Sequence, residues 1–310
     1  MRSNVVAHLA IGLVVVPTVA AAATIAPHRA SYDLAMDGSG DLVDAQGRIA
    51  VEITRPDCDS FDIEYRFVAR FQQEQELVVT DQQTQTLENR ADGTLEFETR
   101  TLVDGAVQQM VRGTAVNDGQ QTHVALVEPE SRSVSVPLSA FPMQHTLTLI
   151  ERAAAGERIV QSRLYDGDPT PEKQLTTTAI IGPAPTPTLS EAGGETGEGA
   201  PATEGSAPAV GESAGESMTD DEDGGDRDAA EITETAAEPS PASQLEGLRS
   251  WRVSESFYDS DSDADGLPVF QTAYTLYENG VSDDLVLTFD GYRLAGGLAS
   301  LDLKAAPDCP

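Results

Sequence analysis

Apolar and polar residues alternate with a period of two along most of this chain. The alternation is clearest in five segments: residues 48–54, 61–71, 95–99, 134–136 and 271–277. It is typical of β-strands that bury one face and expose the other. Turn sequences that contain glycine at residues 91–93, 117–119 and 278–280 predict antiparallel hairpins between such strands. No helical crossovers separate the strands, so we expect a mainly β fold with one antiparallel sheet that protects its edges by closing or coiling on itself.

One segment has a helical pattern instead. Residues 142–155 begin with Pro142 and are followed by Gly156, as helices commonly begin and end. The apolar residues at helical spacing are Met143, Leu147, Leu149, Ile150 and Ala154. We expect a single helix here, with the sheet wrapped on it.

The first 23 residues have the features of a secretory signal peptide. Arg2 supplies a positive charge, residues 9–16 form an apolar run too short to span a bilayer, and Ala20 to Ala23 offer a small-residue cleavage site. We expect cleavage after Ala23. No cysteine follows the apolar run, so a soluble exported protein without a lipid anchor is expected. A buried N-terminal helix is the alternative, but capping residues are missing.

An acidic segment interrupts the alternating pattern at residues 183–247. It is dominated by Gly, Ala, Pro, Ser, Thr and Glu, and it carries about 16 acidic residues against Arg227 alone. Such a composition cannot bury enough apolar surface to offset its ordering entropy, so we expect a disordered insertion. Residues 24–182 and 248–310 then form one domain. An acidic docking segment for a basic partner is the alternative reading.

The charge of the chain excludes several classes of partner. There are 52 Asp and Glu against 19 Lys and Arg, which gives a net charge of −33. Nucleic acids and anionic lipid surfaces would be repelled. Lys173 and Lys304 are the only lysines, and no basic cluster is available for an anionic ligand.

The two cysteines, Cys58 and Cys309, are expected to form a disulfide. An even count of two makes pairing the default in an exported protein. A catalytic or redox-sensing thiol is the alternative, but no C-x-x-C spacing supports it.

Three patterns imitate functional sites. Ser213 lies in a G-x-S-x-G sequence, but it falls in the acidic insertion without a strand before it or a helix after it. Residues 261–265 place Asp261, Asp263 and Asp265 as in half of a calcium loop, which leaves a weak cation site open. The histidines have no metal-ligand spacing. We therefore expect no catalytic residue, no metal site and no cofactor.

Several blocks taken together resemble the EipB-type cell-envelope integrity family of alphaproteobacterial periplasms. They cover nearly the whole mature chain except the acidic insertion: residues 28–34 (HRASYDL), Cys58, 141–145 (FPMQH), 154–158 (AAGER), 164–167 (LYDG), 250–253 (SWRV), 276–281 (LYENGV) and Cys309. The long insertion between Gly182 and Leu248 is a departure from the family.

The resemblance implies a spiral sheet of about fourteen strands wrapped on one helix, with the cysteine pair as the family's disulfide. It also implies a non-enzymatic periplasmic role in keeping the envelope intact, with a tetratricopeptide-repeat protein as a candidate partner. A lipid or lipoprotein carrier that uses the concave face of the sheet is the alternative function. The oligomeric state is open.

We expect the residues of these blocks to maintain the fold. They are His28, Tyr32, Phe141, Pro142, His145, Tyr165, Asp166, Gly167, Trp251, Asn279 and Gly280. Three tyrosines, Tyr32, Tyr165 and Tyr258, are candidates for exposed contacts as well.

Overall fold

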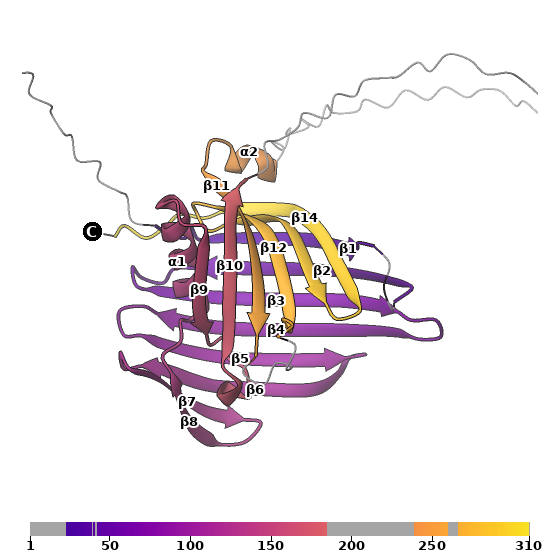
Figure 1. Ribbon diagram of the computed structural model, residues 1–310, viewed down its shortest axis with the longest axis horizontal. Coiled ribbons are helices and arrows are strands. Elements are labelled where there is room, and N and C mark those ends of the chain that lie inside the picture. The colour runs from indigo at the N-terminus through magenta and orange to yellow at the C-terminus, as the bar shows by residue number, and fades with distance from the viewer. Residues whose placement is uncertain (1–22, 39, 41, 185–238, 260–265, 310) are drawn as a thin grey trace, which may run out of the picture. The chain divides into compact units, whose positions relative to one another are not determined.

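The alternating segments form the strands of an antiparallel sheet in the computed structural model (Figure 1). The structure describes residues 23–38, 40, 42–184, 239–259 and 266–309. Strand β3 (Ser60–Gln72) illustrates why these segments are strands: Phe61 and Ile63 are buried, while Asp62 and Glu64 between and beside them are exposed. Each strand therefore contributes one face to the core and one to solvent.

The sheet contains fourteen strands and is accompanied by two short α-helices and a 3-10 turn, η1. The strands are β1 (His28–Met36), β2 (Asp44–Thr54), β3, β4 (Leu77–Asn89), β5 (Thr94–Val103), β6 (Ala106–Asn117), β7 (Gln121–Glu128), β8 (Arg132–Pro137), β9 (Ile159–Leu164), β10 (Leu175–Pro183), β11 (Ser250–Tyr258), β12 (Phe270–Tyr277), β13 (Ser282–Phe289) and β14 (Tyr292–Leu303). The helical segments are α1 (Pro142–Ala154), η1 (Pro171–Lys173) and α2 (Pro241–Leu245).

The strand order is β8-β7-β6-β5-β4-β3-β2-β1-β14-β13-β12-β11-β10-β9, with every neighbouring pair antiparallel. The segment that follows end strand β8 meets the other end strand, β9, at Ala140, which forms a parallel bridge to Leu164. Two backbone hydrogen bonds stabilise this contact: the Ala140 N–H donates to the carbonyl of Arg163, and the Tyr165 N–H donates to the carbonyl of Ala140. The predicted mainly β fold, a single open antiparallel sheet of fourteen strands, is confirmed.

The curvature of the sheet places its two halves across each other. In Figure 1 the long strands β3 to β6 run horizontally, and β9 to β12 cross in front of them at a steep angle. Helix α1 packs inside this curve: Phe141 joins the core residues of β5 to β7, Leu147 those of β2 and β3, and Leu149 those of β9 to β12.

Helix α1 lies where the sequence predicted it, but its buried face differs by one position. Leu147, Leu149, Ile150 and Ala153 are buried together with His145. The expected Ala154 is exposed. Met143 is only half-buried, because it lies in the first turn near the end of the core. No helix of the described residues is long and apolar enough to span a membrane.

The predicted disulfide is present between Cys58 and Cys309, with a Cα–Cα distance of 5.6 Å. It ties the C-terminal segment after β14 to the loop before β3, across a sequence separation of 251 residues.

The segment expected to be a disordered insertion, residues 183–247, overlaps the described residues at both of its ends, and β10 includes Pro183. Within the expected segment 183–247, residues 239–247 are described, and they include helix α2. Leu245 is buried in the core beside β1 and β14, and Gln244 donates a hydrogen bond to the carbonyl of Leu301. A single apolar anchor and a serine cap at Ser240 suffice to order this turn. Residues 185–238 and the expected signal sequence up to residue 22 lie outside the described residues.

Candidate functional site

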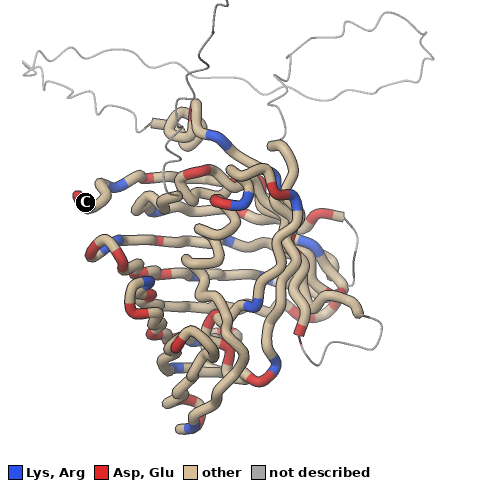
Figure 2. Tube along the Cα trace, turned by 60° about the vertical axis from the view of Figure 1, so that its left-hand side comes forward, with Lys and Arg blue, Asp and Glu red and all other residues tan. Residues whose placement is uncertain are grey.

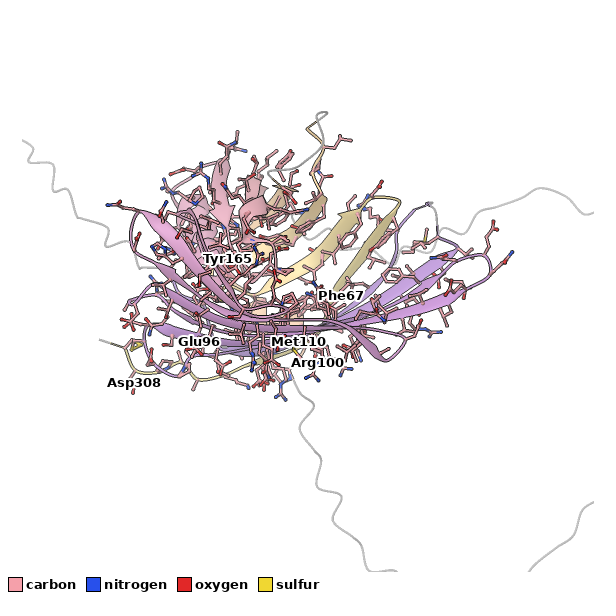
Figure 3. The ribbon with its side chains drawn as sticks, turned by 90° about the horizontal axis from the view of Figure 1, so that it is seen from below. Phe67, Glu96, Arg100, Met110, Tyr165 and Asp308 are labelled. Atoms are coloured by element: carbon pink, nitrogen blue, oxygen red, sulfur yellow. A yellow bond between two sulfur atoms is a disulfide. The ribbon has the colours of Figure 1, made fainter. Side chains whose placement is uncertain are left out.

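The face of the sheet that lies towards α1 is almost free of charge in strands β3 to β6, and we call it the inner face. In β3 its residues are Phe61, Ile63, Tyr65, Phe67, Ala69 and Phe71. All residues of these four strands are described, and Glu88 is the one charged residue at their inner positions. The outer positions carry charges of both signs, such as Glu64 and Arg66. Figure 3 shows Phe67 on the inner side, and Glu96 and Arg100 on the opposite side.

Five aromatic rings touch one another in sequence on the inner face, and we call them the aromatic band: Phe257, Phe270, Phe289, Tyr292 and Phe71. The successive ring centroids are 4.2, 6.3, 4.9 and 5.3 Å apart. Phe257 is buried and the other four are half-buried. The band therefore presents a continuous apolar surface that connects β11, β12, β13 and β14 with β3.

Beside the band the inner face is polar but uncharged. In the register of the sheet, Gln82 of β4 lies opposite Thr101 of β5, and Thr84 lies opposite Thr99. Thr80 lies on the same face of β4. Gln82 is exposed and Thr80 is half-buried. The band and this hydroxyl and amide surface together suit a neutral ligand that is apolar on one side and hydrogen-bonding on the other.

The electrostatics of the whole molecule contrast with the inner face. Figure 2 shows acidic and basic positions interspersed along the strands and turns. On the inner face, burial raises the pKa of Tyr65 to about 12, so this phenol is neutral at physiological pH.

A buried carboxylate from β4 fixes the beginning of helix α1. The N-cap residue Phe141 has no side-chain acceptor, and the two oxygens of Glu88 accept hydrogen bonds from the backbone N–H groups of Met143 and Gln144, each at 2.8 Å. Burial raises the pKa of Glu88 to about 7, although the two N–H donors favour its charged form.

A second buried carboxylate, from β11, holds the same helix from the other side. His145 Nε2 lies 2.8 Å from Glu255 Oε1, which also accepts from Thr177, and Tyr274 donates to Glu255 Oε2 at 2.7 Å. Burial favours the neutral form of Glu255, but His145 and the two hydroxyl donors together lower its pKa below the ordinary value. The network therefore holds an ionised carboxylate inside the protein.

The sequence-predicted motif residues form two packing groups. In one group, the Ala26 N–H donates to the carbonyl of Asn279, and the ring of the buried His28 contacts the carbonyl of Ala26. Gly280 has a φ of +85°, and a Cβ atom there would lie 2.9 Å from the Ile25 side chain. In the other, Phe141 and Tyr165 share a core cluster with Phe97, and the Phe97 and Tyr165 rings are 5.7 Å apart.

The remaining motif residues lie at the borders of these groups. Pro142 is the first residue of α1, Asp166 is exposed, and Gly167 has a φ of +100°. Trp251 is half-buried in β11, with the Arg249 guanidinium 5.6 Å from the centroid of its ring.

The expectation that Tyr32 and Tyr165 provide exposed contacts is wrong, since both are 4% exposed. Their rings fill the interior of the curved sheet, and Tyr258 is half-buried. The histidines have separate partners: His28 the carbonyl of Ala26, His123 Asp118, and His145 Glu255. In the described part of the chain, no group of three or more His, Cys, Asp or Glu is placed to hold a metal ion. Ser213 and residues 261–265 lie outside it.

Sequence reasoning missed Glu88 and Glu255. Each acid occupies a buried position of an alternating strand. In β4, Thr86 is two residues before Glu88 and is also buried. In β11, Val253 and Phe257 are two residues before and after Glu255, and both are buried. An acid that interrupts the buried side of an alternating strand was the available signal.

The family pattern of EipB-like proteins matches residues 19–205 and 224–305. The chain belongs to the EipB-like family. It is 25% identical to the "Cell envelope integrity protein EipB" of Brucella abortus (strain 2308) over 288 residues. The aligned region covers 92% of this chain and 86% of that protein. A crystal structure of a "Beta-barrel-like Protein" of a domain of unknown function from Brucella abortus matches with a TM-score of 0.68 and 24% identity, over 92% of this chain and 100% of that chain. The EipB-like relative is thus named for envelope integrity, and the solved structure supports the fold.

Proposed function

We propose that this EipB-like protein is a non-enzymatic, soluble periplasmic protein that maintains cell-envelope integrity by binding a partner protein. The aromatic band is the contact surface. The observation that supports this assignment is the contiguous band of rings on an uncharged face, in a chain with a net charge of −33. Aromatic side chains dominate the central parts of protein interfaces, whereas charged residues are depleted there.

A lipid or lipoprotein carrier is the second candidate, and the apolar band on the concave face favours it. An acyl chain would be in contact with the rings of Phe71, Phe289 and Tyr292. The neighbouring threonines and Gln82 count against it, because an acyl chain that covered them would leave their polar groups without hydrogen-bond partners. The protein-contact proposal therefore explains more of the inner face.

A crosslinked pull-down from the native periplasm tests the proposal, with bound proteins and lipids identified by mass spectrometry. The wild-type protein is expected to enrich one protein reproducibly, with a tetratricopeptide-repeat protein as the candidate. A Phe71→Ser, Phe289→Ser variant is expected to lose at least fivefold of that enrichment. The matched control is Val107→Ser with Val127→Ser, since these valines are 56% and 51% exposed and lie outside the band.

Each outcome decides between the candidates. Enrichment of acyl lipid or of many lipoproteins in place of one protein favours the carrier. Equal capture of the protein partner by the band variant and the control variant would show that the aromatic band is not the contact surface.

A further inference from the structure

A preformed pocket of about 220 Å³ lies between the end of β9 and the beginning of β10. Its apolar walls come from four separate strands or their flanks: Val136, Leu164, Leu175, Val269 and Phe270. The volume is below the roughly 300–1,000 Å³ of sites for small-molecule ligands. It suits a single large side chain that enters from outside.

The loop that forms one wall of this pocket is held by several hydrogen bonds. The hydroxyl of Tyr165 donates to the carbonyl of Asp168 at 3.1 Å, and the Tyr165 N–H donates to Ala140. Arg132 bonds to the carbonyl of Pro169 and forms an ion pair with Glu172 of η1. A pocket whose wall is fixed in this way binds without a large ordering cost.

Gly167 is the residue that lets this loop pass close to the core. Its φ is +100°, and a Cβ atom there would lie 3.0 Å from the ring of Phe97. The Leu-Tyr-Asp-Gly block of residues 164–167, which the sequence marked as a fold element, therefore also builds the pocket wall.

The pocket and the aromatic band share one residue, Phe270. Phe270 lines the pocket, stacks on Phe257 at 4.2 Å and contacts Phe289 at 6.3 Å. A chain that lies along the band reaches the pocket at Phe270.

The lining of the pocket is net acidic. Asp166, Asp168 and Asp259 are present with one cation, Lys173, whose Nζ is 3.6 Å from Asp259 Oδ2. Basic groups on a ligand are therefore attracted to this site, and acidic groups are repelled.

We propose that this pocket anchors one large apolar side chain, aromatic or leucine, that a basic segment of the partner protein inserts. The inference rests on the proposed function, because it names the part of the partner that the band and pocket recognise. Buried aromatic or aliphatic anchors that fill such pockets carry much of the affinity of protein interfaces.

The test uses N-acetyl-tryptophanyl-arginine amide as the probe and amide chemical shifts of the isotope-labelled mature protein as the readout. Saturable shifts are expected at residues 164–175 and 269–270. Binding should weaken at least fivefold when arginine is replaced by glutamate in the probe, and also when tryptophan is replaced by glycine. Val269 lines the pocket and is 45% exposed. The larger side chain of a Val269→Trp variant should fill the pocket. This variant is therefore expected to bind the probe at least fivefold more weakly. Val107→Trp is the matched control.

Two results would overturn the inference: shifts that map to other residues in the wild-type protein, or unchanged binding by a folded Val269→Trp variant. The wild-type shift map decides the question alone if Val269→Trp lowers the melting temperature. The pull-down separates the two proposals. Loss of the partner by the band variant with full capture by Val269→Trp would retain the proposed function and reject the pocket, and full capture by the band variant would reject the proposed function itself.

Discussion

At the scale of single residues, the pair of His145 and Glu255 is buried in the interior. The two side chains are 7% and 4% exposed, so water cannot replace His145 as a partner of the Glu255 carboxylate. Breaking a buried ion pair by removal of one partner typically costs about 3–5 kcal/mol, whereas replacing both by apolar residues is often close to neutral.

His145→Leu is therefore expected to lower the free energy of unfolding by about 3 kcal/mol, because it leaves the buried Glu255 carboxylate without its hydrogen-bond partner at Oε1 from the helix. The double change His145→Leu with Glu255→Leu should recover part of this loss. Urea unfolding at pH 7 measures both. His123→Leu is the control, since the His123 and Asp118 side chains are each 46% exposed and their pair should contribute little to stability. Equal losses at His145 and His123 would contradict the expectation.

At the scale of elements, helix α1 depends on a strand for its cap. Its N-cap residue is Phe141, and the carboxylate of Glu88 replaces the missing serine or aspartate. An acid near the positive end of a helix is favourable, but the burial of Glu88 in β4 opposes its ionisation.

The pKa of Glu88 predicts a pH dependence of stability. The folded-state pKa is about 7 and the ordinary value is 4.5, so the native state holds this proton more tightly than the unfolded state does. The resulting stability is complete below about pH 4.5 and is lost as the pH rises through 7, by about 3 kcal/mol at 1.4 kcal/mol per unit.

Glu88→Gln should remove this slope, which urea unfolding midpoints between pH 5 and pH 8 would measure. Glu96→Gln is the control, because Glu96 lies exposed on the outer face of β5. A Glu88→Gln protein that keeps the slope of the wild type would show that another group causes it.

At the scale of the whole molecule, the disulfide joins two residues that are 251 positions apart in the sequence, so it closes a very long loop of the chain. Cys58 lies before β3 and Cys309 lies after β14, so the bond joins strands that β2 and β1 separate in the sheet. The chain-entropy estimate for a closed loop of this length is about 5 kcal/mol, which is an upper bound.

Cys309→Ser is accordingly expected to lower the melting temperature of the oxidised protein by several degrees or more. Thermal unfolding of the variant and of the wild type, with and without reductant, measures the effect. Reductant should lower the wild type to the level of the variant and leave the variant unchanged. Two titratable thiols in native protein taken from the periplasm would contradict the role of this bond.

Local sequence patterns were enough to predict five strand segments, which lie in β2, β3, β5, β8 and β12, together with helix α1 and the antiparallel class of the sheet. These properties follow from local patterns: alternation every second residue in β3, Pro142 and Gly156 around α1, and glycine turns between strands. Helix α2 was missed because composition averaged over a long segment hides one apolar residue, Leu245, that the core takes up.

Which residues meet on the inner face depends on how distant strands pack together, so local sequence patterns do not predict it. The contact of Phe71 with Tyr292, the cap of Glu88 on α1 and the pair of His145 with Glu255 each join distant parts of the chain. Strand order, register and the curvature of the sheet determine these contacts. A local pattern fixes which side chains point inwards, but it does not fix which strand will lie across the interior from them. That depends on the packing of all fourteen strands and α1 together.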